Sequence, residues 1–249
     1  MKKNFKTALA YAATMSALVT TIPAEATVYL QGSATTNIGT ALTTMGVSYT
    51  ALGGGAMSNT PGANDVLIMS FDGGTGPFVD YRTKLDQGLD IIMFGGSNYQ
   101  PFRDWASLYF NLTDTGAGWH TDGAWHTVAS NTATQYMPAS YIPVNIGVTY
   151  HMLGFAATAD TTMLGQNDEN VNIAAFREYL NGGSFNYLAM DPGPYASNAT
   201  DQANFTIPYL RGALDAASVG INGVPEPASV LLLGVGLAGL GFSRKLKAR

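Results

Sequence analysis

The chain has no cysteine among its 249 residues. Thiol catalysis and disulfide bonds are therefore excluded, and the fold must depend on packing alone. Charged residues are also scarce, at 12% of the chain, and the formal net charge at pH 7 is −5. Between residues 27 and 223 there are 5 basic and 15 acidic residues, so this part has a net charge near −10. A field of that sign repels nucleic acid, and we expect no nucleic-acid partner.

The C-terminal tail combines a short motif, an apolar run and a basic end. The motif is Pro225-Glu226-Pro227, the charge-free run covers residues 228–242, and the basic residues that follow are Arg244, Lys245, Lys247 and Arg249. A helix over the run would be roughly 22 Å long, somewhat less than the ~30 Å of a bilayer's hydrocarbon core. Basic residues stay on the cytoplasmic side of a membrane. We therefore predict a transmembrane helix over 228–242 and a basic stop over 244–249.

This order of motif, Gly-rich apolar helix and Arg/Lys cluster resembles the PEP-CTERM sorting tail of Gram-negative bacteria, on which exosortase systems act. The resemblance implies an exosortase-type sorting enzyme as a partner. It also implies an intermediate anchored in the inner membrane, followed by release to the cell surface or the extracellular medium. A plain C-terminal membrane anchor and a buried apolar helix are the alternative interpretations of the same residues.

The N-terminal segment is typical of an exported protein. A lysine-rich start precedes a mostly small and apolar stretch from Ala8 to Ile22, and Ala24 and Ala26 fit the small-x-small rule for signal cleavage. Signal peptidase and the export machinery are therefore expected partners. The predicted organisation has three parts, which are a signal peptide over 1–26, an exported body over 27–223 and a sorting tail over 224–249.

The body has the pattern of an α/β fold. Continuous apolar runs over 65–71 and 89–94 are typical of strands buried on both faces of a parallel sheet. Further strands are expected over 28–30, 47–52, 148–155, 162–164 and 185–190, and helices over 34–45, 78–87, 101–110, 169–180 and 202–217. The stretch 111–143 is polar and aromatic, and we expect an insertion or irregular loop there. We predict a doubly wound, mostly parallel sheet.

Several segments of the body resemble the class I glutamine-amidotransferase-like fold. They are Asp65-Val-Leu-Ile, Leu89-Asp-Ile-Ile-Met-Phe-Gly-Gly, Tyr150-His151-Met-Leu and Gly182-Gly183-Ser-Phe. The resemblance implies a flavodoxin-like sheet. It does not extend to the reaction, because the amidotransferases need a nucleophilic cysteine and this chain has none.

Candidate ligand-binding residues fall in two groups. Ligands of a doubly wound sheet bind beyond the carboxyl ends of its strands, which points to the three loops that begin at Asp72, Gly95 and Asp191. The second group is His120, Asp122 and His126, with His151 as a further ligand or base. Histidine and aspartate bind divalent metals, so a divalent metal is the cofactor that these residues could hold, although the sequence establishes none. The alternatives are glycine-rich turns and a loop with incidental histidines.

The sequence assigns no catalytic residue. No Gly-x-Ser-x-Gly segment is present to support a Ser/His/Asp triad, and the aromatic residues Trp105, Trp119, Trp125 and Tyr136 suit either sugar stacking or core packing. We expect a sorted surface or extracellular-matrix protein with a structural or binding role associated with exopolysaccharide. The alternative is an extracytoplasmic hydrolase that is glycan-directed or metal-dependent.

Overall fold

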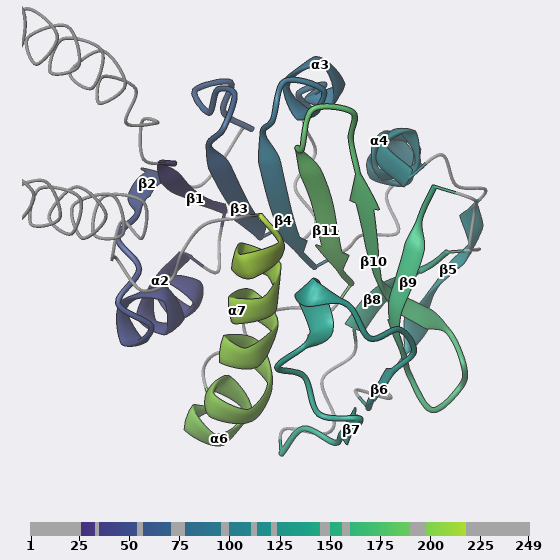
Figure 1. Ribbon diagram of the computed structural model, residues 1–249. Coiled ribbons are helices and arrows are strands. Elements are labelled where there is room, and N and C mark those ends of the chain that lie inside the picture. The colour runs from purple at the N-terminus through teal and green to yellow at the C-terminus, as the bar shows by residue number, and fades with distance from the viewer. Residues whose placement is uncertain are drawn as a thin grey trace, which may run out of the picture.

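The computed structural model describes the body of the chain in a series of stretches (Figure 1), namely residues 26–32, 35–53, 57–70, 78–95, 100–110, 114–120, 124–144, 150–155, 160–189 and 198–217. Apart from Ala26, the predicted signal peptide lies outside these residues. The sorting motif, the predicted transmembrane helix and the basic stop lie outside them as well. Within the described stretches no helix is long and apolar enough to span a membrane.

The elements follow one another along the chain as alternating strands and helices. The strands are β1 Val28–Gly32, β2 Thr50–Gly53, β3 Val66–Ser70, β4 Asp90–Phe94, β5 Asp114–His120, β6 Trp125–Thr127, β7 Ser140–Tyr141, β8 Tyr150–Phe155, β9 Thr162–Gln166, β10 Asn172–Glu178 and β11 Ser184–Leu188. The helical segments are α2 Thr35–Thr44, α3 Arg82–Leu85, α4 Gln100–Phe110, η1 Thr132–Thr134, α6 Ala199–Asp201, η2 Gln202–Thr206 and α7 Ile207–Ala216.

Nine of the described strands form one mixed sheet in the order β2-β1-β3-β4-β11-β10-β9-β6-β7, and β5 pairs with β8 in a separate antiparallel pair. The pairings from β2 to β11 are parallel. Those from β11 to β7 are antiparallel. The α/β class is therefore confirmed, but the prediction of a mostly parallel sheet is wrong, because half of the sheet is antiparallel.

The antiparallel half exists because residues 172–178, inside the helix expected over 169–180, form the strand β10. The helical prediction relied on Ile173, Phe176 and Leu180 sharing one face, yet Leu180 is 92% exposed. A tight turn explains the difference. The N–H of Tyr179 donates to the carbonyl of Gly183 at 2.8 Å, and Gly182 has a φ of +87°, which glycine adopts without steric cost. This turn folds β10 back onto β11 as a hairpin.

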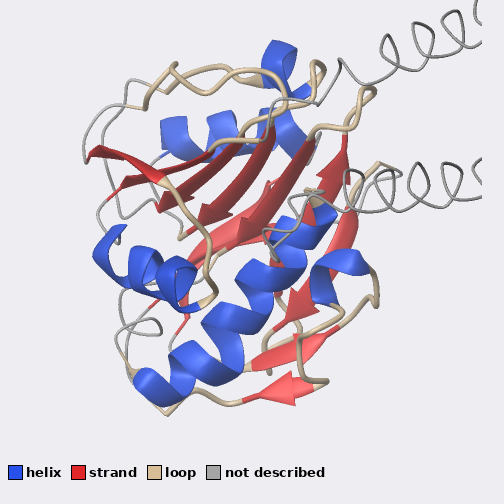
Figure 2. Cartoon of the chain, turned by 60° about the vertical axis from the view of Figure 1, so that its left-hand side comes forward, coloured by secondary structure: helices blue, strands red, loops and turns tan. Residues whose placement is uncertain are grey.

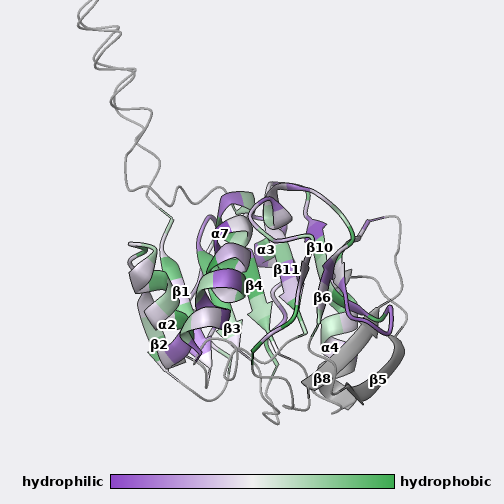
Figure 3. Cartoon of the chain, turned by 90° about the horizontal axis from the view of Figure 1, so that it is seen from below, coloured by the Kyte–Doolittle hydropathy of each residue, from purple (hydrophilic) through white to green (hydrophobic). Residues whose placement is uncertain are grey.

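Helices cover both faces of the sheet, with α2 and α7 on one face (Figure 2). On that face, Tyr209 of α7 packs edge-on against Phe94 of β4, with ring centroids 5.7 Å apart. On the other face, Tyr109 of α4 stacks on Phe185 of β11 at 4.9 Å. Every residue of β3, β4 and β11 is buried. Figure 3 shows β4 coloured largely as hydrophobic. The strands predicted over 28–30, 65–71, 89–94 and 185–190 correspond to β1, β3, β4 and β11, and residues 71 and 190 lie outside the described residues.

The predicted helices 34–45, 101–110 and 202–217 correspond to α2, α4 and the α6–η2–α7 segment. The helix predicted over 78–87 is reduced to the single turn α3. Tyr81 accounts for the late start, because its N–H donates to the Tyr109 hydroxyl at 2.9 Å and its own hydroxyl donates to the Ser58 carbonyl at 2.6 Å. These bonds hold the residues before α3 against α4 and the loop after β2. The stretch 111–143 holds the strands β5, β6 and β7.

Candidate functional site

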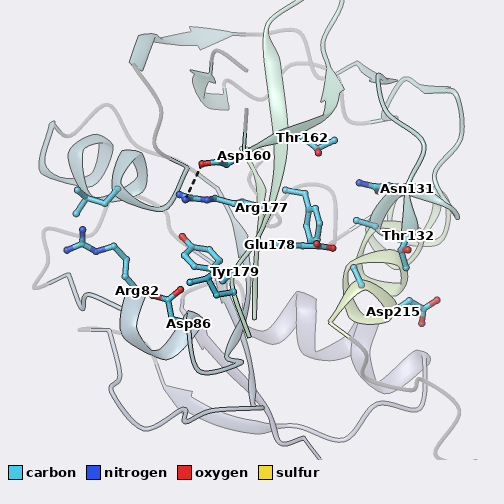
Figure 4. Close-up of a pocket in the computed structure, with 15 residues that line it drawn as sticks. Arg82, Asp86, Asn131, Thr132, Asp160, Thr162, Arg177, Glu178, Tyr179 and Asp215 are labelled. Atoms are coloured by element: carbon cyan, nitrogen blue, oxygen red, sulfur yellow. Dashed lines mark ion pairs between the residues drawn. The ribbon is translucent and has the colours of Figure 1, made fainter. Parts of the chain in front are cut away.

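A broad hollow of about 1130 Å³ lies where the amino ends of the central parallel strands meet the β10–β11 turn (Figure 4). Helix α3 precedes β4 at this edge, and the last turn of α7 returns to it (Figure 1). We call this hollow the amino-edge groove. Its lining comprises Arg82, Asp86, Leu108, Asn131, Thr132, Ala133, Asp160, Thr162, Phe176, Arg177, Glu178, Tyr179, Leu180, Asp215 and Ala216.

The end of β10 divides this lining into two sides. Successive side chains of a strand point to opposite faces of a sheet. Arg177 and Tyr179 accordingly lie beside Arg82 and Asp160, whereas Glu178 lies on the side of Asp215 (Figure 4). The groove therefore runs around the β10–β11 hairpin at the edge of the sheet and has lining residues on both faces of the sheet.

The side that contains Arg177 is held by several contacts. A guanidinium N–H of Arg177 donates to the carbonyl of Tyr109 at 2.7 Å, and the hydroxyl of Tyr179 donates to the same carbonyl at 2.7 Å. The guanidinium carbon lies 5.0 Å from the centre of the Tyr179 ring, within the range of a cation–π contact. Burial raises the pKa of Tyr179 to about 12, so its hydroxyl stays protonated near neutral pH.

The side that contains Glu178 is formed by β9, η1 and α7. Asp215 of α7 accepts hydrogen bonds from the Tyr136 hydroxyl at 2.7 Å and from the side-chain amide of Gln135 at 3.1 Å. Arg211, one turn earlier in α7, lies over the Tyr136 ring at 4.9 Å. The segment after η1 is thus fixed to α7, which keeps this wall of the groove in place.

His120, His126 and His151 lie on three different strands, and the metal site that they were expected to form stays a prediction. His120 is the last residue of β5 and His126 lies in β6, and these two strands belong to different sheets. Asp122 lies outside the described residues. In the register of β5 and β8, His120 pairs with Tyr150 and His151 pairs with Trp119. Among the described residues, no group of three or more His, Asp or Glu side chains could hold a metal ion.

His126 contacts a residue that the sequence analysis did not group with it. Its Nε2 contacts the carboxylate of Asp168, in the turn between β9 and β10. The exposed fractions of the two side chains are 42% and 58%, so water surrounds the pair. Ion pairs at exposed positions contribute little to stability. Sequence reasoning missed Asp168, because only the pairing of β6 with β9 brings it near His126.

The candidate loops at Asp72 and Asp191 follow β3 and β11 at the carboxyl edge of the sheet. Asp72 and Asp191 both lie outside the described residues, so their roles stay predictions. The described groove is at the opposite edge, and sequence reasoning missed it because its residues come from segments far apart in the chain. The Asn181-Gly182-Gly183 segment marked a turn in the sequence, but only the structure shows that Leu180 beside it is exposed.

The aromatic residues proposed for sugar stacking separate into buried and exposed ones. Trp105 is 5% exposed and donates to the Val79 carbonyl at 2.7 Å, and Trp125 is fully buried and donates to the Thr127 hydroxyl at 2.9 Å. Both tryptophans therefore belong to the core. Tyr136, by contrast, is 41% exposed.

Two solved structures are similar to the chain, and the first of them shares its fold. A cytoplasmic protein from Salmonella typhimurium is similar over 78% of this chain and 97% of its own, with 10% identity and a TM-score of 0.50. A glutamine amidotransferase from Thermotoga maritima is similar over 81% of this chain and 100% of its own, with 8% identity and a TM-score of 0.44. No curated protein matches the chain.

The tail gives a more specific result than the body. A protein-family model described as the PEP-CTERM protein-sorting motif matches residues 223–245. The matched range includes the Pro225-Glu226-Pro227 motif, the whole apolar run and the first basic residues, in the order that the sequence predicts. The chain therefore carries a PEP-CTERM protein-sorting motif, which implies export and sorting by an exosortase.

Proposed function

We propose that this protein is a component of the cell surface or extracellular matrix whose α/β body binds exopolysaccharide after the sorting tail has been removed. The observation that carries the proposal is the sorting motif at residues 223–245. The lysine-rich, apolar N-terminal segment supports the same route, because it is typical of a signal peptide. The strongly acidic body suits a protein that stays soluble outside the cell.

The proposed route has two cleavages. Signal peptidase removes residues 1–26 during export, and the apolar run 228–242 then holds the protein in the inner membrane with its basic end in the cytoplasm. An exosortase-type enzyme next cuts near Pro225-Glu226-Pro227 and releases the body. The apolar run has the composition for this temporary anchorage, and the basic residues fix its orientation.

The test is the intact mass of the protein in membrane, surface and exopolysaccharide fractions, for the wild type and for a variant with Pro225, Glu226 and Pro227 all changed to Ala. We expect a wild-type surface species that starts at Thr27 and lacks residues 228–242. The variant should accumulate in the membrane with Arg249 retained. The exposed Glu169→Ala, in the turn before β10, is the matched control and should be processed normally.

A wild-type species that keeps Arg249 and stays in the membrane fraction would contradict sorting and support a permanent anchor. A processed species absent from the exopolysaccharide fraction would contradict the binding role. The hydrolase alternative stays a prediction, because no arrangement of described residues favours it.

A further inference from the structure

We propose that the amino-edge groove is the saccharide-binding site of the body and that it selects neutral glycan chains over polyanionic ones. This inference rests on the proposed function and adds to it the place of binding and the chemical class of the ligand. It is argued from the shape, the polarity and the charge of the groove.

The polarity of the lining suits a ligand rich in hydroxyl groups. Ten of the 15 lining residues are polar, and they are the residues labelled in Figure 4. Carboxylates accept hydrogen bonds, guanidinium groups donate them, and the side chains of asparagine and threonine do both. A polymer with alternating hydroxyl donors and acceptors can satisfy such a mixed surface, whereas an apolar ligand would leave many of these groups unpaired.

The apolar members of the lining suit the less polar faces of sugar rings. Phe176 is partly buried on β10, Leu108 of α4 is 48% exposed, and Leu180 at the tip of the hairpin is 92% exposed. Ligand sites typically combine apolar and aromatic surface with a few directed polar groups. The groove has this combination on both sides of β10.

The charge of the lining argues against a polyanionic ligand. The lining contains two basic residues, Arg82 and Arg177, and four acidic ones, which are Asp86, Asp160, Glu178 and Asp215. Both arginines also have acidic neighbours. A guanidinium nitrogen of Arg82 lies 2.6 Å from a carboxylate oxygen of Asp80, and one of Arg177 lies 3.8 Å from a carboxylate oxygen of Asp160. A chain of uronate or phosphate groups would meet a net negative surface on a body that is itself near −10. A neutral chain avoids this repulsion.

The groove is also ordered before any ligand binds. Arg177 and Tyr179 share the Tyr109 carbonyl as an acceptor, and Asp215 is held by Tyr136. Side chains that are already fixed lose less conformational entropy on binding, which favours affinity. Thr162 and Glu178 are exposed, so these two positions can be changed without disturbing the core.

The experiment measures retention of the processed surface protein in native gels that contain dextran, a neutral glucan, or alginate, a polyanionic uronate. Two groove variants are compared with two matched controls. Thr162→Trp places a large side chain in the groove, and Thr50→Trp makes the same change on the exposed edge strand β2. Glu178→Gln removes the negative charge of a hydrogen-bond acceptor in the groove, and Glu169→Gln removes an equivalent charge outside the groove.

We expect the wild type and both controls to be retained by dextran and not by alginate. Thr162→Trp should weaken dextran binding by at least about tenfold, the equivalent of ~1.4 kcal/mol, and Glu178→Gln by roughly threefold to tenfold. Equal retention of all variants by dextran would overturn the groove as the site and leave the proposed function intact. Retention by alginate alone would overturn the preference for neutral chains. No retention by either polymer would contradict the binding function itself.

Discussion

At the scale of single residues, Asp90 is a carboxyl group placed in the hydrophobic centre of the sheet. It opens β4 and is 5% exposed, and its Oδ1 accepts a hydrogen bond from the Ser184 hydroxyl at 2.6 Å. Burial raises the pKa of Asp90 to about 7, and the hydrogen bonds from Ser184 oppose only part of that rise. An ionised carboxylate at this position is therefore costly to the folded state.

The raised pKa predicts a pH-dependent loss of stability that Asp90→Asn should abolish. The unfolded chain releases this proton near the ordinary pKa of about 4, so the contribution of Asp90 is fully present below pH 4 and is lost as pH rises through about 7. At pH 8 we expect Asp90→Asn to be more stable than the wild type by about 2 to 4 kcal/mol, because one pKa unit corresponds to about 1.4 kcal/mol. At pH 4 the two should be similar.

Urea unfolding at pH 4 and pH 8 measures this difference, with the exposed Glu169→Gln as the control. A wild type that unfolds at the same urea concentration as Asp90→Asn at both pH values would show that the carboxyl group ionises without cost.

At the scale of elements, the contact between α7 and η1 depends on one glycine. A Cβ atom at Gly212 would lie 2.1 Å from the carbonyl oxygen of Ala133, which is far inside van der Waals contact. The segment η1 cannot move aside easily, because the Asn131 side chain accepts from the Thr134 N–H at 3.2 Å and the Thr134 hydroxyl bonds back to the Ala129 carbonyl at 2.7 Å. Helix α7 can therefore pack this closely against η1 only because residue 212 has no side chain.

The prediction at this scale is that Gly212→Ala lowers the free energy of unfolding by about 1 to 3 kcal/mol through overpacking. Helix propensity alone predicts the opposite sign, since alanine favours a helix interior over glycine by about 1 kcal/mol. The control is Gly62→Ala, where a Cβ atom would lie 3.5 Å from the nearest atom, an ordinary contact distance. Thermal and urea unfolding of both variants show whether the free energy of unfolding falls or rises. A Gly212→Ala variant more stable than the wild type would refute the packing argument.

At the scale of the whole molecule, the excess of acidic over basic residues affects the stability of the entire fold. The processed body has a net charge near −10, and the ion pair between Arg82 and Asp80 is exposed to water. Self-repulsion of a highly charged body lowers its stability. Salt weakens that repulsion because the screening length falls from about 30 Å at 0.01 M to about 3 Å at 1 M.

We therefore expect the Tm of the processed protein to rise as NaCl increases from about 0.01 M to about 1 M, as the screening length shortens. Glu169→Lys should raise the Tm at low salt, and that gain should disappear at high salt. Calorimetry at both salt concentrations measures these changes. A Tm that falls with salt would mean that attractive ion pairs outweigh the net repulsion.

Local pattern was sufficient to predict the sorting tail and several elements of the body. The tail is recognised by the family model because motif, apolar run and basic cluster follow one another directly in the chain. The strands β3 and β4 were predictable because their residues are buried on both faces and therefore apolar throughout. Helices α2 and α4 were predictable because glycine breaks and apolar spacing mark them in the sequence.

Tertiary contacts decided the rest. Residues 172–178 have a spacing that fits a helix as well as a strand, and only pairing with β9 and β11 makes them a strand. The amino-edge groove joins residues from α3, η1, β10 and α7, and the partner of His126 is 42 positions away. The sequence by itself thus determined the class of fold and the destination of the protein, because both depend on contiguous residues. The antiparallel half of the sheet and the groove depend on distant segments, whose meeting is set by which surfaces can be buried together.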